Sequence, residues 1–172
     1  MKKKLVGILV ASSMMLMVGC SAKESNKTEA EEIKKVFVYG SLRSDMFNYD
    51  IYLDGKVTKN DKATIKGDLS HIENKGYPAV TPGNGEVIGE LMEFKDFDST
   101  LKELDELEAY EVGKENENEY NREIVDVKLE DGTTEKAYYY EYNPPAEYNK
   151  DDKLVPVKHG DWKVYMEENN KK

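Results

Sequence analysis

The stretch KVFVYGSLRSD, residues 35–45, decides how the rest of the chain is read. Its apolar and aromatic residues 36–39 predict a short buried strand, because a strand buried on both faces shows no polar alternation. Gly40 ends this strand, and Ser41 and Leu42 begin a turn. A glycine there allows an unusual backbone conformation and the close approach of another group. Two interpretations follow: a plain strand-ending turn, or a turn whose consecutive N–H groups converge on an anion.

The N-terminal part of the 172-residue chain has the features of an export signal. Lysines at positions 2–4 precede an apolar run, residues 5–18, that is short for a membrane span. The run closes on MVGC, which resembles the lipobox of bacterial lipoproteins with Met17 where leucine is usual. Cys20 is the single cysteine, so an internal disulfide is excluded and the thiol needs another role.

We therefore expect residues 1–19 to be a lipoprotein signal peptide and Cys20 to carry the lipid. The alternatives are an ordinary signal peptide with an incidental cysteine and a weak membrane anchor. Each of the three places the working domain outside the cytoplasm, and the first anchors it to the bacterial cell membrane, facing outward. Residues 20–34 are rich in charged and small polar groups, which is typical of a flexible linker. The domain itself is expected over residues 35–167.

Charge and composition narrow the partners of this domain. Removal of residues 1–19, which carry three lysines and no acid, takes the formal net charge from −10 to −13. Such a surface repels nucleic-acid phosphates and anionic lipid, so we expect no nucleic-acid partner and a membrane contact made by the N-terminal lipid. All 12 tyrosines lie beyond the signal, which favours a small β-rich domain.

Most of the domain is predicted to be strands. Residues 63–72 and 86–94 alternate well enough for strands, and each contains a glycine, Gly67 or Gly89, that indicates a bulge or a tight bend. Residues 122–142 predict a β-hairpin that turns at an Asp-Gly pair and returns as a tyrosine-rich strand.

One helix is predicted over residues 98–110, with Asp98 or Ser99 as its N-cap. At about 100° per residue, Glu108 falls on the leucine face of this helix. A carboxylate aimed at an apolar interior costs free energy unless it is protonated, paired or lining a cavity. The alternative is that the helix ends at this point and Glu108 reaches solvent.

Several motifs, in one order, resemble the γ-glutamylcyclotransferase-like (AIG2-like) family: FVYGSL, GYPAV, VIGEL, LDELEAY, YNREIVDV, AYYYEY and GDW. The resemblance runs from about residue 36 to residue 165. It implies an α+β fold, a small mixed β-barrel with flanking short helices. It also implies an enzyme of intramolecular aminoacyl-transfer or lyase type, which releases 5-oxoproline and an amine or amino acid from a γ-glutamyl compound without cofactor or metal.

The resemblance also implies roles for individual residues. Glu108, the fifth residue of LDELE, corresponds to the catalytic general acid and base. The backbone amides of Tyr39, Gly40, Ser41 and Leu42 would hold the substrate's carboxylate or its polarised γ-carbonyl.

Further positions carry over from the same motifs. Tyr77 and Pro78 of GYPAV correspond to a loop beside the pocket, and Tyr120 of YNR to a pocket hydroxyl. Arg122 of the same motif corresponds to a structural guanidinium, and a buried ion pair with Asp105 accounts for it equally well.

Other residues are expected outside the chemistry. Trp162 and Tyr165 have helical spacing and are expected in the core. His71 and His159 lack the spacing of metal ligands, so a zinc site is not expected. Ala109 stands where a glycine commonly follows the glutamate in the family. Alanine restricts the backbone of this turn and so affects the direction in which the Glu108 side chain points. The acidic stretch KENENE, residues 114–119, is expected to be a solvated loop.

Two other functions stay open at this point. The domain could be a non-catalytic, lipid-anchored module that binds γ-glutamyl or amino-acid ligands, or an inert surface scaffold. An acid on the leucine face argues against both, because a scaffold would be more stable with leucine there. We expect a small-molecule γ-glutamyl substrate and a monomer.

Overall fold

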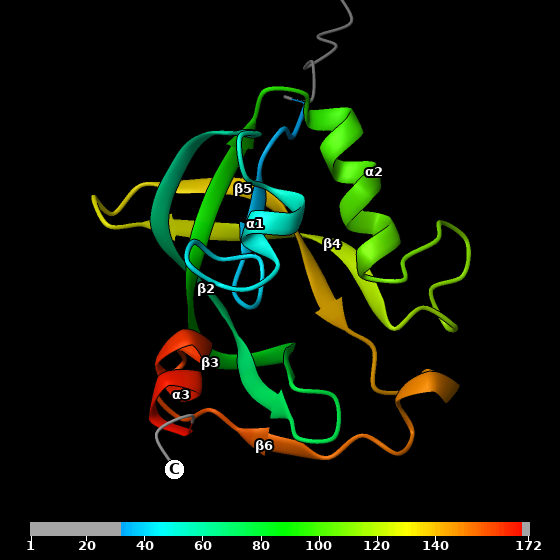
Figure 1. Ribbon diagram of the computed structural model, residues 1–172. Coiled ribbons are helices and arrows are strands. Elements are labelled where there is room, and N and C mark those ends of the chain that lie inside the picture. The colour runs from blue at the N-terminus through cyan, green and yellow to red at the C-terminus, as the bar shows by residue number, and fades with distance from the viewer. Residues whose placement is uncertain (1–31, 170–172) are drawn as a thin grey trace, which may run out of the picture. The chain divides into compact units, whose positions relative to one another are not determined.

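A computed structural model describes residues 32–169 of the chain (Figure 1). The predicted signal peptide, the predicted lipidation site Cys20 and the linker up to residue 31 lie outside the described residues, so these assignments stay predictions. Within residues 32–169, none of the helices has the length and apolar character needed to cross a membrane.

Five strands close into a mixed β-barrel, which confirms the predicted fold class. Their order is β3-β1-β5-β4-β2, and β2 pairs back onto β3. The pair β1–β5 is parallel and the other neighbouring pairs are antiparallel. A sixth short strand, β6, continues the pairing along the end of β2. The strands are β1 Val36–Val38, β2 Val57–Ile72, β3 Tyr77–Phe94, β4 Tyr120–Leu129, β5 Thr134–Tyr142 and β6 Leu154–Pro156.

Short helices flank the barrel (Figure 1). They are α1 Tyr49–Tyr52, α2 Phe97–Leu107, the 3₁₀ turn η1 Glu147–Asn149 and α3 Trp162–Asn169. The predicted caps of α2, Asp98 or Ser99, are wrong. The N-cap is Asp96, whose carboxylate accepts a hydrogen bond from the Ser99 N–H at 3.1 Å. The predicted helix is also too long at its C-terminus, because Glu108 is the C-cap.

The two strand glycines act differently. Gly67 lies at a register shift between Lys66 and Asp68, as predicted for a bulge. Gly89 keeps its register, and it is needed for another reason: a Cβ there would lie 2.4 Å from Cζ of Phe37. The predicted hairpin at 122–142 is confirmed by β4 and β5.

Alternate residues of the strands divide the core into two clusters, as the pleat requires. Phe37 of β1 belongs to one cluster, which also contains Trp162 of α3. Val36 and Val38 belong to the other, which contains Leu104 of α2. The end of β1 therefore lies between two packed layers, and its last residues are fixed from both sides.

Candidate active site

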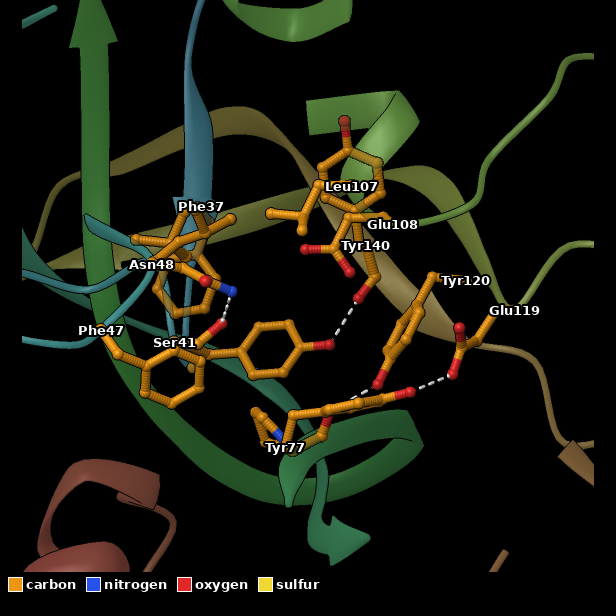
Figure 2. Close-up of a pocket in the computed structure, with 15 residues that line it drawn as sticks. Phe37, Ser41, Phe47, Asn48, Tyr77, Leu107, Glu108, Glu119, Tyr120 and Tyr140 are labelled. Atoms are coloured by element: carbon orange, nitrogen blue, oxygen red, sulfur yellow. Dashed lines mark hydrogen bonds between the residues drawn. The ribbon is translucent and has the colours of Figure 1, made fainter. Parts of the chain in front are cut away.

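A cavity of about 170 Å³ opens where the end of β1, the start of β3, the end of α2 and the start of β4 meet (Figure 2). All of the pocket residues expected from the sequence line it, namely Tyr39, Gly40, Ser41, Leu42, Tyr77, Pro78, Glu108 and Tyr120. The sequence did not identify the rest of the lining, which is Phe37, Val38, Phe47, Asn48, Leu107, Glu119 and Tyr140.

Glu108 faces this cavity although α2 ends one residue before it (Figure 2). Within residues 32–169, its carboxylate oxygens accept no hydrogen bond, and burial raises its pKa to about 8, with the negative charge of Glu119 as a second cause. Every fully buried side-chain polar atom in the described part of the chain has a hydrogen-bond partner. The unpaired oxygens of Glu108 must therefore touch the open space of the cavity, where they are available to a ligand.

Ala109 fixes the direction in which Glu108 points. Its φ of 51° lies in the left-handed region, where a helix end usually has glycine. The turn is closed by the Tyr110 N–H, which donates to the carbonyl of Asp105 at 2.9 Å. An alanine in this conformation costs about 1 kcal/mol, so the position that aims the acid carries local strain.

The turn after β1 presents free backbone donors to the cavity. Among the described residues, the backbone N–H groups of residues 39–42 have no acceptor. The carbonyls of this turn are paired: the Arg43 N–H donates to Gly40 at 3.0 Å, and the Asn48 N–H donates to Ser41 at 3.1 Å. The Asn48 side chain also donates to Oγ of Ser41 at 2.9 Å, which leaves the Ser41 hydroxyl proton free to point into the cavity.

Gly40 is required by packing rather than by its backbone angle. Its φ is not in the left-handed region, but a Cβ at this position would lie 2.4 Å from Cγ of Pro78. Gly40 was expected to allow the close approach of another group, and the group that approaches it is the Pro78 ring. This contact joins the turn after β1 to the start of β3.

Two tyrosine hydroxyls hold the walls of the cavity together. Tyr39 donates to the carbonyl of Tyr140 at 2.7 Å, as Figure 2 shows. Tyr120 donates to the carbonyl of Pro78 at 2.7 Å. Tyr120 therefore brings a hydroxyl to the pocket, as expected, but its proton is donated to the wall and only its oxygen can still accept a hydrogen bond.

Glu119 is the acidic residue among the lining residues that the sequence interpretation missed. It belongs to the stretch expected to be a solvated loop, yet its side chain is only 11% exposed. Oε1 accepts from the Tyr77 hydroxyl at 2.6 Å and from Nζ of Lys75 at 2.8 Å. Its place directly before Tyr120, at the start of β4, was the available signal.

The structure gives Arg122 a structural role. Its guanidinium pairs with Asp105 at 2.5 Å and lies over the rings of Tyr110 and Tyr138. The other oxygen of Asp105 accepts from the Tyr140 hydroxyl at 2.8 Å. The ion-pair interpretation is thus confirmed, and the pair fixes α2 against the β4–β5 hairpin, three residues before Glu108.

Trp162 lies in the core, as expected, whereas Tyr165 is partly buried and packs against the core. Trp162 is fully buried, and its Nε1 donates to Nδ1 of His71 at 3.1 Å. Tyr165 packs against the same cluster and contacts the His71 ring. Neither residue lines the cavity.

A buried ion cluster fixes the loop that carries Ser41. Arg43 pairs with Glu90 of β3 at 3.2 Å and with Asp161, next to α3, at 2.7 Å. The backbone N–H of Ser44 donates to the second oxygen of Glu90 at 3.0 Å. The first loop, the longest hairpin and the last helix thus meet beside the cavity.

With this geometry established, comparison with known proteins places the chain. Residues 36–164 match the family described as gamma-glutamyl cyclotransferase, AIG2-like. The chain belongs to this family. No curated protein matches the chain.

Solved structures share the AIG2-like fold with this chain. YkqA from Bacillus subtilis is similar with a TM-score of 0.58 and 23% identity, over 82% of this chain and 44% of YkqA. An AIG2-like protein from Mus musculus gives a TM-score of 0.55 and 21% identity, over 72% and 86% of the two chains. A protein of Arabidopsis thaliana gives 0.54 and 23%, over 83% and 89%. These identities support the fold alone, and the chain spans less than half of YkqA.

Proposed function

We propose that this domain is a γ-glutamylcyclotransferase, with Glu108 as its general acid and base. The observation that carries the proposal is one geometry: an unpaired carboxyl with a pKa of about 8 lines the same small cavity as free backbone N–H groups. A raised pKa near neutrality suits a group that must both accept and release a proton.

The reaction is an internal acyl transfer. The α-amine of the γ-glutamyl group attacks its own γ-carbonyl, a new C–N bond closes the 5-oxoproline ring, and the C–N bond to the leaving amine breaks. Glu108 takes the proton that the attacking amine loses and delivers it to the leaving nitrogen. The substrate supplies its own nucleophile, so the protein needs to orient the chain and move one proton.

The free N–H groups of residues 39–42 have a matching task. Negative charge develops on the γ-carbonyl oxygen as the amine attacks, and preorganised donors stabilise such charge in a site that excludes water. The alternative is that these N–H groups bind the α-carboxylate of the substrate. Binding of either the γ-carbonyl oxygen or the α-carboxylate would keep the substrate folded beside Glu108.

The size of the cavity favours a small reacting group. At about 170 Å³, it is smaller than the pockets of roughly 300 Å³ or more that take drug-sized ligands. It suits a folded glutamyl group whose leaving amine extends outward. Phe47, 55% exposed, lies at this outer part of the lining.

The test is turnover by the purified domain on a panel of γ-glutamyl peptides and amines, with release of 5-oxoproline as the readout. We expect Glu108→Gln to lose at least about 100-fold in kcat, since general acid–base catalysis contributes roughly 10²- to 10⁴-fold. Glu106→Gln, an exposed position on the same helix, is the control and should react normally. Wild-type rates in Glu108→Gln refute the role of Glu108, and saturable binding without product indicates the non-catalytic module.

We also propose that the domain is exported and anchored through lipid on Cys20, as a monomer at the outer face of the cell membrane. The MVGC ending of the apolar run and the single cysteine support this. Mass spectrometry of the mature N-terminus and the effect of Cys20→Ala on membrane fractionation test it. An unmodified Cys20 in the membrane fraction contradicts the proposal.

A further inference from the structure

Glu119 brings a second carboxylate to the cavity, and one of its oxygens is unpaired. Oε1 accepts from both Tyr77 and Lys75, while Oε2 has no donor among residues 32–169. Because every fully buried polar side-chain atom in this part of the chain is paired, Oε2 must keep contact with open space. The proton transfer proposed above gives this oxygen no task.

Glu119 shares its cationic partner with another carboxylate. Among residues 32–169, Lys75 is its one cationic contact, and the same ammonium also pairs with Asp152 at 2.8 Å and donates to Asn149 at 3.0 Å. One lysine thus serves two carboxylates, which leaves an excess of negative charge. Burial of Glu119 without a further cation costs free energy, so a cationic ligand is favoured here.

The groups that face Glu119 come from several elements. They are Lys75 in the turn before β3, Tyr77 at the start of β3, Glu108 at the end of α2, Tyr120 of β4 and Tyr142 of β5. Tyr148 of η1 and Asp152 lie around the shared Lys75 ammonium. On its other side, Glu119 lines a shallow hollow with one lysine and four further acids, which are Asp105, Glu106, Glu111 and Glu117. The balance of charge on both sides therefore favours a cation.

A γ-glutamyl compound carries such a cation at the reacting end. Its α-amine arrives protonated at neutral pH and must give up that proton beside Glu108. We propose that Oε2 of Glu119 binds the α-ammonium group of the substrate and positions it against Glu108. This inference rests on the proposed function for its substrate and adds a recognition residue to it.

The two carboxylates then divide the work. Glu108 has a pKa of about 8 and is mostly protonated at neutral pH in the empty site, so it holds no cation by itself. Glu119 supplies the standing charge that attracts the ammonium. Once the ammonium is bound, its positive charge favours the ionised form of Glu108, whose proton is released to solvent. The carboxylate then takes one proton from the ammonium and delivers it to the leaving nitrogen, and it takes the second proton from the ring nitrogen after the attack, which restores the protonated form.

The test uses two ligands that differ only in the α-ammonium, L-glutamine and 4-carbamoylbutanoate, measured by calorimetry. Binding is measured in the Glu108→Gln background, where turnover is blocked. We expect L-glutamine to bind more tightly by about 10-fold or more, as for a hydrogen bond to a charged group. Adding Glu119→Gln should remove most of this preference and leave the affinity for 4-carbamoylbutanoate unchanged. Glu117→Gln, an exposed position in the same loop, is the matched control.

Further variants separate recognition from folding. Glutamine at 119 keeps an acceptor for Tyr77 and Lys75, and Glu119→Asp keeps the charge, so Glu119→Asp should restore part of the preference. In an active domain, Glu119→Gln should also raise KM and move the acidic limb of kcat/KM to lower pH, because loss of the Glu119 charge lowers the pKa of Glu108.

Each outcome decides between the two proposals. The role of Glu119 is overturned if the preference for L-glutamine survives Glu119→Gln. It is also overturned if Glu108→Gln alone shows no preference for L-glutamine over 4-carbamoylbutanoate. A domain that shows the Glu119-dependent preference but never forms 5-oxoproline keeps this inference and loses the proposed reaction.

Discussion

Glu108→Gln should make the fold more stable, and by an amount that depends on pH. The carboxyl ionises at about 8 in the folded protein and at 4.5 when unperturbed. Below pH 4.5 it is protonated in both states and has no effect. Between these values the unfolded chain loses the proton that the folded protein keeps, so stability falls as pH rises. Above pH 8 the loss of folding free energy is complete. The Glu108→Gln variant has no ionisable group at this position and does not show this loss.

The magnitude follows from the same two values. Each pKa unit corresponds to about 1.4 kcal/mol, so full ionisation removes up to about 5 kcal/mol of folding free energy. Because the residue is only partly buried, solvent screening reduces this value, and we expect about 2 kcal/mol at pH 8 and none at pH 4. The acid that we propose for catalysis is thus a cost to folding, as active-site groups often are.

Urea unfolding of both proteins from pH 4 to pH 9 measures this effect. The difference in free energy of unfolding between Glu108→Gln and wild type isolates Glu108, because the other titrating groups are common to both. Glu106→Gln, whose side chain is 72% exposed, should show a difference near zero throughout. Parallel stability curves for Glu108→Gln and wild type would refute the burial that raises the pKa of this carboxyl.

Three other substitutions test the geometry around the site, each by urea unfolding. Ala109→Gly should stabilise the fold by about 1 kcal/mol, because glycine adopts the left-handed conformation at no steric cost; a loss of stability contradicts the strain. Gly40→Ala should cost about 2 kcal/mol, because its Cβ would clash with Pro78, and an unchanged midpoint shows that the contact is loose. Arg43→Met should cost about 3–5 kcal/mol, because it leaves the buried Glu90 unpaired; a neutral result means that Glu90 reaches solvent.

Local patterns in the sequence predicted much of the fold. The buried run at 36–39, the β4–β5 hairpin and the bulge at Gly67 follow from patterns of neighbouring residues, which short-range sterics and pairing determine. The ends of α2 did not follow. Asp96 competes with Asp98 and Ser99 for the same N–H groups, and only tertiary packing selects among them.

The lining residues that belong to recognised motifs were predicted from the sequence. Those that reach the cavity only through contacts between distant segments were missed. Glu108 was identified as an acid on an apolar face, and its carboxyl lines the cavity, although through a helix cap. Glu119 looked like one more charge in an acidic loop, because its burial depends on Lys75, 44 residues away. Likewise, the commitment of the Tyr120 hydroxyl to the Pro78 carbonyl depends on how two strands cross.

The ion pair between Arg43 and Asp161 has a consequence for biosynthesis. All of the cavity lining lies between residues 37 and 140, so a ribosome has translated Glu108 and its surroundings well before it reaches Asp161. Until then, the loop that carries Ser41 lacks one of its two anionic anchors. We therefore expect the domain to become competent late, and a nascent chain halted before Asp161 to be inactive although it contains every lining residue.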